Sequence, residues 1–466
     1  MQDRIYPPIL NRLGWFITLL SVMMVTVRAE SVVPAEIFDP GYLEGDSNYH
    51  CLTAASDGYL YFAVNSHHPG ASVRIYRFDT STDTTALVGD VSAALGLEPA
   101  REIVHGKIHT PLVEWDGYLY FATHTSQYDG NLPLINPPDG RQPYAGGHFM
   151  RLNLATQKIE DVAALGLPNE GLITMAVDKP GRTLYGLTWP SAQLVSFNLD
   201  EGRLKNWGAV QQRGEWGAFP DEWDFVCRKL GVTPEGTVYG STNTGRIWHF
   251  DSDDQRPVKY FTQLNLDAVP PIQAEDFTIE PVPHFFWRNW RTLIWNDATA
   301  SFWGLHGGSG QLFEFTPATG TLRSVRPLNP TTIVPGRRNP FRTQLGFMLG
   351  PDNTLLYLAH APPTPSTADR AVATSVHLLT YAIDTDTFTD HGAITGPDHR
   401  RIFFTESIAL GPDDHLYSVA WVETTDPAKM QQVQTARAFA APEETQDIIF
   451  EIQLIRLPRR DALTTP

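Results

Sequence analysis

The chain has 466 residues, of which 42% are hydrophobic and 19% are charged, so it is long enough to bury one large core or two smaller ones. Its 35 Lys and Arg residues stand against 52 Asp and Glu residues, and the net charge of −17 excludes a general nucleic-acid binder, which needs a surplus of basic residues. Two cysteines, Cys51 and Cys227, are too few for a disulfide framework, which excludes a small stapled scaffold.

The first 29 residues have the composition of a secretory signal peptide. Two arginines precede an apolar run over residues 13–27, and Val27 and Ala29 are the small residues before the expected cleavage point. The run of 15 residues is shorter than the ~20 residues that span a bilayer, so cleavage after Ala29 is favoured over a signal anchor. We therefore expect a secreted or periplasmic protein with no membrane segment after cleavage, in which residues 30–466 form a single domain.

After the signal peptide, a turn followed by a short aromatic strand recurs seven times. Segments such as SDGYLYFAVN, WDGYLYFATH and PDDHLYSVAW show the pattern, and their aromatic residues repeat at intervals of 54 to 65 residues. These anchor residues are Tyr61, Tyr120, Tyr185, Tyr239, Trp303, Tyr357 and Tyr417. Seven self-similar units indicate a repeat architecture.

Each unit also contains an apolar run before its anchor and an alternating strand after it. β-Branched and aromatic residues between Asp-Gly and Pro-Asp turns are typical of antiparallel strands, and helical periodicity is almost absent outside the polar insert at 427–446. Three visible strands and a weaker fourth in each of the seven units predict an all-β fold, a seven-bladed β-propeller. A β-sandwich or a solenoid is the alternative.

Two offsets from the anchors bring polar residues to one rim of the predicted propeller, because neighbouring antiparallel strands begin and end at the same edge. Eleven residues before the anchor, the first offset selects His50, His109, Arg228, Thr292 (beside Arg291) and Glu406, with Glu170 and Arg342 nearest to it in the third and sixth units. Four residues after the anchor, the second selects Asn65, His124, Trp189, Asn243 and Trp421, with His306 and His360 one position earlier. A rim rich in His, Arg and Trp predicts a binding or catalytic funnel.

The second unit carries the densest set of candidates. A long loop over residues 125–147 joins two of its strands on this rim and contains Tyr128 and Tyr144, and loops of this length are usually functional. We expect His109, His124 and His148 to meet there. The alternative for each histidine is a structural role, in which the ring caps a loop carbonyl.

The residue types at the rim favour a β-elimination over other reactions. The chain lacks G-x-S-x-G and phosphate-binding loop motifs, and the rim has too few carboxylates for a glycosidase. In a uronic-acid chain, an arginine that pairs with the carboxylate makes the C5 proton more acidic, and a neutral histidine then accepts that proton. Arg228 is the candidate neutraliser, and its alternative role is a salt bridge between blades. Trp189 and Trp421 are candidates for stacking on sugars.

Three segments resemble the seven-bladed propeller polysaccharide lyases that act on ulvan. They are HGKIHTPLVEWDGYLYFATH, YAGGHFMRLNLAT and EGLITMAVDKPGRTLYGLTWP, and the resemblance is strongest over residues 100–245. In that family two histidines, a tyrosine and an arginine at the funnel perform a syn elimination next to a uronate. The resemblance implies that His124 and His148 are the histidine pair, that Arg228 is the neutraliser, and that His109 lies beside them.

The family's tyrosine has no counterpart at the expected place, because after Trp189-Pro190 the chain reads Ser-Ala-Gln at 191–193. Either a loop tyrosine, Tyr128 or Tyr144, substitutes for it, or the activity has changed or been lost. The candidates for substrate binding are Tyr144, Tyr128, Trp189, Asn243, Arg291, His306 and Trp421.

The predicted elimination requires no cofactor. The resemblance allows a structural Zn or Ca ion with Cys227 as a ligand, and the alternative for this cysteine is a buried free thiol. The expected partner is an anionic polysaccharide and the expected state is a monomer. Two other functions stay open: a non-catalytic propeller that binds glycans or proteins, and a metal-dependent lactonase or hydrolase, which the scarcity of carboxylates disfavours.

Overall fold

The computed structural model describes residues 32–129, 132–217, 222, 224–251, 258–269, 287–331, 343–361, 375–437 and 449–463. The predicted signal peptide at 1–29 lies outside the described residues, as does Arg342. The described residues all belong to one structural unit, Ser31–Pro466.

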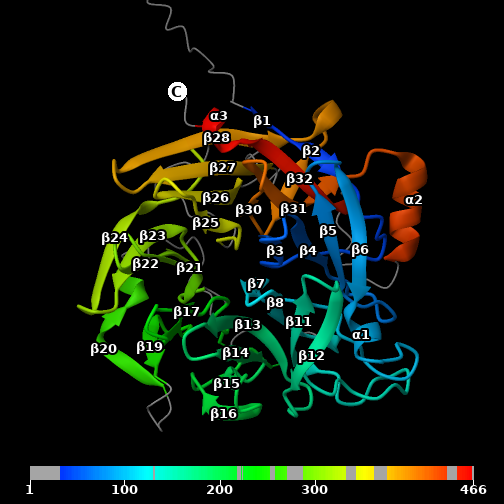
Figure 1. Cartoon of the computed structure of the whole chain (residues 1–466), viewed down its shortest axis with the longest axis horizontal. Coiled ribbons are helices and arrows are strands. Elements are labelled where there is room, and N and C mark those ends of the chain that lie inside the picture. The colour runs from blue at the N-terminus through cyan, green and yellow to red at the C-terminus, as the bar shows by residue number, and fades with distance from the viewer. Residues whose placement is uncertain are drawn as a thin grey trace, which may run out of the picture. The chain divides into compact units, whose positions relative to one another are not determined.

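Seven sheets of four or five strands follow one another along the chain and surround a common centre, so the predicted seven-bladed β-propeller is confirmed (Figure 1). Blade 1 consists of β3 (Leu52–Ala54), β4 (Leu60–Val64), β5 (Arg74–Asp79) and β6 (Thr84–Asp90). Blade 2 consists of β7 (Val113–Trp115), β8 (Tyr118–Ala122), β11 (His148–Asn153) and β12 (Lys158–Ala164). A two-stranded hairpin, β9 (Tyr128–Asp129) and β10 (Leu132–Pro133), lies in the loop between β8 and β11.

The next three blades each have four strands. Blade 3 consists of β13 (Gly171–Asp178), β14 (Thr183–Trp189), β15 (Gln193–Asn198) and β16 (Arg203–Ala209). Blade 4 consists of β17 (Gly231–Val232), β18 (Val238–Ser241), β19 (Arg246–Phe250) and β20 (Lys259–Asn265). Blade 5 consists of β21 (Trp290–Asn296), β22 (Ser301–His306), β23 (Gln311–Thr316) and β24 (Thr321–Pro327).

The last two blades are completed by strands from the beginning of the described chain. Blade 6 contains β25 (Phe347–Leu349), β26 (Thr354–Ala361), β27 (Ser375–Ala382) and β28 (Thr387–Thr395), and β1 (Val32–Pro34) pairs in parallel with β28. Blade 7 contains β29 (Ile402–Thr405), β30 (Ala409–Leu410), β31 (His415–Glu423) and β32 (Phe450–Arg459), and β2 (Glu36–Phe38) pairs antiparallel with β32. These two pairings join the two ends of the ring and cover strand edges that would otherwise be exposed.

The anchors lie in the most buried strand of each blade, because that strand packs against neighbouring blades on both faces. All residues of β4, β14 and β22 are buried. One apolar cluster joins Tyr185 of blade 3, Tyr239 of blade 4 and Phe302 of blade 5. The turn at Asp116-Gly117, with φ of 53° and 78°, has the left-handed backbone that a type I′ hairpin requires.

Helices are short and few among the described residues. They include α1 (Val91–Ala94), α2 (Pro427–Ala436) and α3 (Arg460–Leu463), and α2 occupies part of the insert where helical periodicity was expected. The Asp426 side chain caps α2 by accepting a hydrogen bond from the backbone N–H of Ala428. No helix in the described part of the chain has the length and apolar composition that crossing a bilayer requires.

Candidate functional site

Contacts between non-adjacent blades mark the centre of the ring, where the sequence predicts a funnel. Nε2 of His50, just before blade 1, lies 3.1 Å from the carbonyl oxygen of Arg228, just before blade 4. Arg291 of blade 5 pairs with Glu406 of blade 7, and its Nη2 lies 3.0 Å from each carboxylate oxygen. Because contacts that skip a blade form only near the common centre, these four buried residues meet there. The first offset selects three of them, and Arg291 is next to a fourth selected position, Thr292.

Six side chains from the segments around blades 1, 2 and 3 form a connected set, which we call the funnel cluster: Tyr49, Lys107, His109, His124, Tyr128 and Trp189. The His109 ring stacks on Tyr49 at a centroid distance of 4.4 Å, and the rings of His124 and Tyr128 lie 5.1 and 5.2 Å from that of Trp189. Nζ of Lys107 donates a 2.5 Å hydrogen bond to Oη of Tyr128 and lies 5.8 Å from the centroid of Tyr49. Lys107 therefore links the two groups of rings.

Burial keeps the two histidines of the funnel cluster uncharged. Desolvation, together with nearby positive charges, lowers the pKa of His109 and of His124 well below the usual value. Nδ1 of His109 lies 3.0 Å from the carbonyl oxygen of Ile173, whereas Nδ1 of His124 is buried without a hydrogen-bond partner among the described residues. Gly171 approaches this ring so closely that a Cβ would collide with Nδ1. Both rings are neutral hydrogen-bonding groups held in fixed places.

The two predicted funnel arginines are already paired with glutamates. Nη1 and Nη2 of Arg228 lie 2.7 and 2.6 Å from the two carboxylate oxygens of Glu215, and both side chains are buried. Glu215 belongs to the same connection between β16 and β17 as Arg228, so the pair braces that connection rather than two blades. Arg291 is neutralised by Glu406 in the same way. Arg228 therefore forms a salt bridge within its own connection, which differs from the alternative of a salt bridge between blades, and its guanidinium is engaged where the sequence predicted pairing with a uronate.

Tyr144 and His148 lie outside the funnel cluster. Oη of Tyr144 lies 2.9 Å from Nδ1 of His105, and the His105 and His148 rings are 5.2 Å apart. Nδ1 of His148 lies 3.0 Å from Oδ1 of Asp161, which belongs to the outermost strand of blade 2. The expected meeting of His148 with the other two histidines is therefore indirect, through His105.

The other predicted binding residues are engaged by neighbouring groups, within their own blade for His306 and Trp421 and at the start of the next blade for Asn243. Oδ1 of Asn243 accepts a 3.3 Å hydrogen bond from the backbone N–H of Arg288, and Nδ1 of His306 lies 3.0 Å from Oγ of Ser309. The Trp421 ring stacks on the rings of Phe404 and Phe450 at 4.4 and 4.1 Å, so aromatic side chains already occupy the positions where a sugar was expected.

Sequence reasoning missed three residues that the structure brings to the rim: Lys107, Glu215 and His67. Lys107 lies between two histidines in the HGKIH segment. This clustering of basic residues is a sequence signal, but neither offset selects position 107. His67 lies two residues beyond the position that the second offset selects, and Nδ1 of its ring contacts Asp46. Glu215 lies in a long connection with no repeat pattern, so nothing in the sequence marked it.

The surroundings of Cys227 do not resemble a metal site. Its Sγ donates to the carbonyl oxygen of Lys229 at 3.0 Å, and burial raises the pKa of the thiol, which favours the protonated form. Within the described ranges, no group of three His, Cys, Asp or Glu side chains is arranged to hold a metal ion. The structural ion stays a prediction that these residues do not support.

Comparisons with known proteins bear on the fold alone. No family model matches the chain, and no curated protein matches it. A candidate 6-phosphogluconolactonase from Bacteroides uniformis is similar at 13% identity with a TM-score of 0.49, over 80% of this chain and 94% of that one. A periplasmic gluconolactonase from Pseudomonas aeruginosa is similar at 13% identity with a TM-score of 0.45, over 74% and 85% of the two chains. The extracellular domain of a candidate hybrid two-component system from B. thetaiotaomicron is similar at 14% identity with a TM-score of 0.46, over 84% of this chain and 38% of that one.

Proposed function

We propose that the protein is an exported polysaccharide lyase that cleaves an anionic, uronate-containing polysaccharide of the ulvan type by β-elimination. The observation that supports this best is the meeting of Lys107, Tyr128 and His124 around Trp189. An elimination beside a uronate needs a cation for the carboxylate, a base for the C5 proton and an acid for the leaving oxygen. A lysine is suited to the first task and a tyrosine to the third, and a neutral histidine at this rim is suited to the second.

In this proposal Lys107 takes the role that sequence reasoning gave to Arg228. The guanidinium of Arg228 is engaged by Glu215 in its own connection, whereas Nζ of Lys107 donates to Oη of Tyr128 within the funnel cluster. A uronate carboxylate bound beside the ammonium would be neutralised, and the enolate that develops on loss of the C5 proton would be stabilised. The acidic net charge of −17 opposes long-range attraction of such a substrate, but salt screens that repulsion beyond ~8 Å.

The reaction proceeds by one proton abstraction and one proton donation. A neutral imidazole accepts the C5 proton, the freed electron pair forms the C4–C5 double bond, and the C4–O bond breaks. Oη of Tyr128 donates its proton to the departing oxygen, and the imidazolium and the phenolate then return to their resting states by exchange with solvent. Tyr128 thereby substitutes for the family tyrosine that is missing at 191–193, whereas Tyr144 is bonded to His105 instead.

A second candidate is a non-catalytic glycan-binding propeller. It is favoured by the burial of His124, which is 2% exposed, and by the neutralised state of both funnel arginines. A funnel of this kind would bind a sugar through aromatic faces and hydroxyl contacts without proton transfer.

The experiment that tests the lyase is ultraviolet absorbance during incubation of residues 30–466 with ulvan and with other uronate polysaccharides. We expect absorbance to rise as C4–C5 double bonds form, and we expect Lys107→Met to reduce the rate by about 10²-fold or more, because the carboxylate loses its cation. The control is Lys205→Met, which removes an exposed lysine from the outer strand of blade 3. A flat trace from folded protein on every substrate contradicts the lyase and favours the binding propeller.

A further inference from the structure

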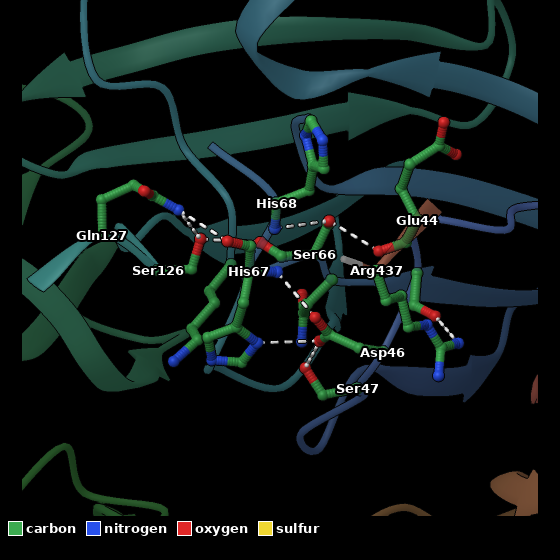
Figure 2. A network of polar contacts seen from close by, with 12 residues as sticks. Glu44, Asp46, Ser47, Ser66, His67, His68, Ser126, Gln127 and Arg437 are labelled. Carbon is green, nitrogen blue, oxygen red and sulfur yellow. Dashed lines mark hydrogen bonds and ion pairs between the residues drawn. The ribbon is translucent and has the colours of Figure 1, made fainter. Parts of the chain in front are cut away.

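His67, a histidine on the same rim but outside the funnel cluster, is held by the buried carboxylate of Asp46 (Figure 2). Asp46 precedes β3 and His67 follows β4, so the two residues lie at the same edge of this antiparallel pair of strands. Nδ1 of His67 lies 2.8 Å from Oδ1 of Asp46, and the backbone N–H of His67 donates to Oδ2 at 2.7 Å. Oγ of Ser47 donates to Oδ1 at 2.9 Å, so both carboxylate oxygens are fixed.

This arrangement sets the tautomer of the imidazole. Burial alone would raise the pKa of Asp46, but the His67 ring, its hydrogen bonds and the charge of Arg437 at the end of α2 lower it below the usual value. The ionised carboxylate accepts a hydrogen from Nδ1, which leaves the lone pair on Nε2. Nε2 has no hydrogen-bond partner among the described residues, and the His67 side chain is 32% exposed. The ring is thus partly exposed, and its proton-accepting atom is not engaged by a neighbour in the described part of the chain.

Hydrogen bonds place His67 beside the segment that carries Tyr128. Nε2 of Gln127 donates to the carbonyl oxygen of His67 at 2.8 Å, and Oγ of Ser126 donates to the carbonyl oxygen of Ser66 at 2.6 Å (Figure 2). The ring of His67 is also close enough to His124 for its charge to lower the pKa of that residue. His67 therefore lies at the same end of blades 1 and 2 as the funnel cluster.

We propose that His67 is the base that removes the C5 proton, and that Asp46 is the positioning residue that holds its ring. This inference rests on the proposed lyase function and assigns a step that the funnel histidines perform poorly. A buried histidine whose pKa is far below neutrality accepts a proton weakly, which applies to His109 and His124. In the step, Nε2 of His67 takes the C5 proton, the C4–O bond breaks as the double bond forms, and Tyr128 protonates the leaving oxygen.

The chain offers a matched control pair at the opposite rim. Nδ1 of His415 lies 3.1 Å from Oδ2 of Asp413, and the backbone N–H of His415 donates to Oδ1 at 3.3 Å. The His415 side chain is 28% exposed, close to the value for His67. His415 begins β31, whereas His67 follows the end of β4, so the two pairs share their chemistry but not their rim.

The test is a comparison of kcat and KM for elimination in wild type, Asp46→Asn, His67→Gln and His67→Ala. We expect His67→Gln to lose about 10²- to 10⁴-fold in rate, and imidazole added to His67→Ala to restore part of it. Asp46→Asn removes the carboxylate that holds Nδ1 of His67, so kcat should fall by about tenfold or more while KM stays within about twofold of the wild-type value. Asp413→Asn and His415→Gln should keep the wild-type kcat and KM.

Two results would overturn the inference while leaving the lyase in place. One is a His67→Gln rate within about threefold of wild type, since a general base contributes far more. The other is an Asp46→Asn variant whose kcat stays within about threefold of wild type, since a ring that no longer has its positioning residue should transfer the proton more slowly. Absence of elimination by folded wild type on every uronate polysaccharide overturns the proposed function itself, and this inference with it.

Discussion

Arg228 and Glu215 form a buried, bidentate ion pair, with Nη–Oε distances of 2.7 and 2.6 Å, inside the connection that leads from blade 3 to blade 4. Nη1 of Arg228 also donates to the carbonyl oxygen of Val226 at 2.7 Å. The guanidinium therefore binds its own connection at three points. A residue so fully engaged is expected to matter first for stability.

We predict that Arg228→Met lowers the free energy of unfolding by about 3–5 kcal/mol, because it leaves the Glu215 carboxylate buried without a counter-ion. Replacing both partners, as Arg228→Met with Glu215→Met, should recover most of the loss. Urea unfolding followed by tryptophan fluorescence measures both. Arg323→Met is the control, since its pair with Glu314 is 54% exposed on the arginine side and should contribute no more than ~1 kcal/mol. Equal losses in the two single variants would contradict a bracing role for Arg228.

Stability should fall as the pH drops below neutrality, because several histidines are buried in their neutral form. Burial lowers the pKa of His105 and of His360 to about 3, chiefly through desolvation. Between pH 6.5 and about 3 the unfolded chain binds protons that the folded chain does not, so each such histidine costs about 1 kcal/mol of stability per pH unit. The stability that such a histidine contributes is fully present above its pKa in the unfolded chain. It is lost as the pH falls toward its pKa in the folded chain.

Urea unfolding at pH 7, 6 and 5 measures this slope. His360→Gln should reduce the slope of unfolding free energy against pH, because one buried histidine no longer contributes to it. His399→Gln, which changes an exposed side chain, should leave the slope unchanged. A slope that is the same in all three proteins would show that His360 is protonated in the folded state.

The third prediction concerns how closure of the ring contributes to stability, and it compares two adjacent valines. In β1, Val33 is 3% exposed and packs in the core of blades 6 and 7, whereas Val32 is 58% exposed. Val33→Ala should lower the free energy of unfolding by about 2 kcal/mol, and Val32→Ala should change it by no more than ~0.5 kcal/mol. Similar effects of the two substitutions, measured by urea unfolding, would mean that β1 does not pack on β28 in solution.

The fold could be predicted from the sequence because each blade repeats one strong local signal. An aromatic anchor in a doubly buried strand, preceded by a turn such as Asp116-Gly117, marks one blade each time it occurs. The first offset also selects His50, His109 and Arg228, which meet in the structure, since strand register fixes where a backbone position lies.

The partners of these side chains could not be predicted in the same way. Glu215 reaches Arg228 from a connection with no repeat, and Asp161 reaches His148 from an outer strand that no offset considered. Trp421 is predicted to face a sugar, but its ring stacks on that of Phe450. Phe450 lies 29 residues later, beyond an insert, so the sequence does not indicate this contact. Register predicts the rim at which a residue lies, whereas packing between segments decides what its side chain touches.

The central claim is that Lys107 and Tyr128 form the eliminating site. The most direct measurement compares the effect of removing the Tyr128 hydroxyl with the effect of removing the hydroxyls of two other tyrosines. Initial rates of C4–C5 double-bond formation would be recorded for wild type, Tyr128→Phe, Tyr144→Phe and Tyr118→Phe on the same uronate polysaccharide. Tyr118 begins β8 at the opposite rim of blade 2, so its hydroxyl is the control. We predict that Tyr128→Phe loses about 10²-fold or more in kcat while Tyr118→Phe keeps the wild-type rate. A wild-type rate in Tyr128→Phe, or a loss confined to Tyr144→Phe, would contradict the account.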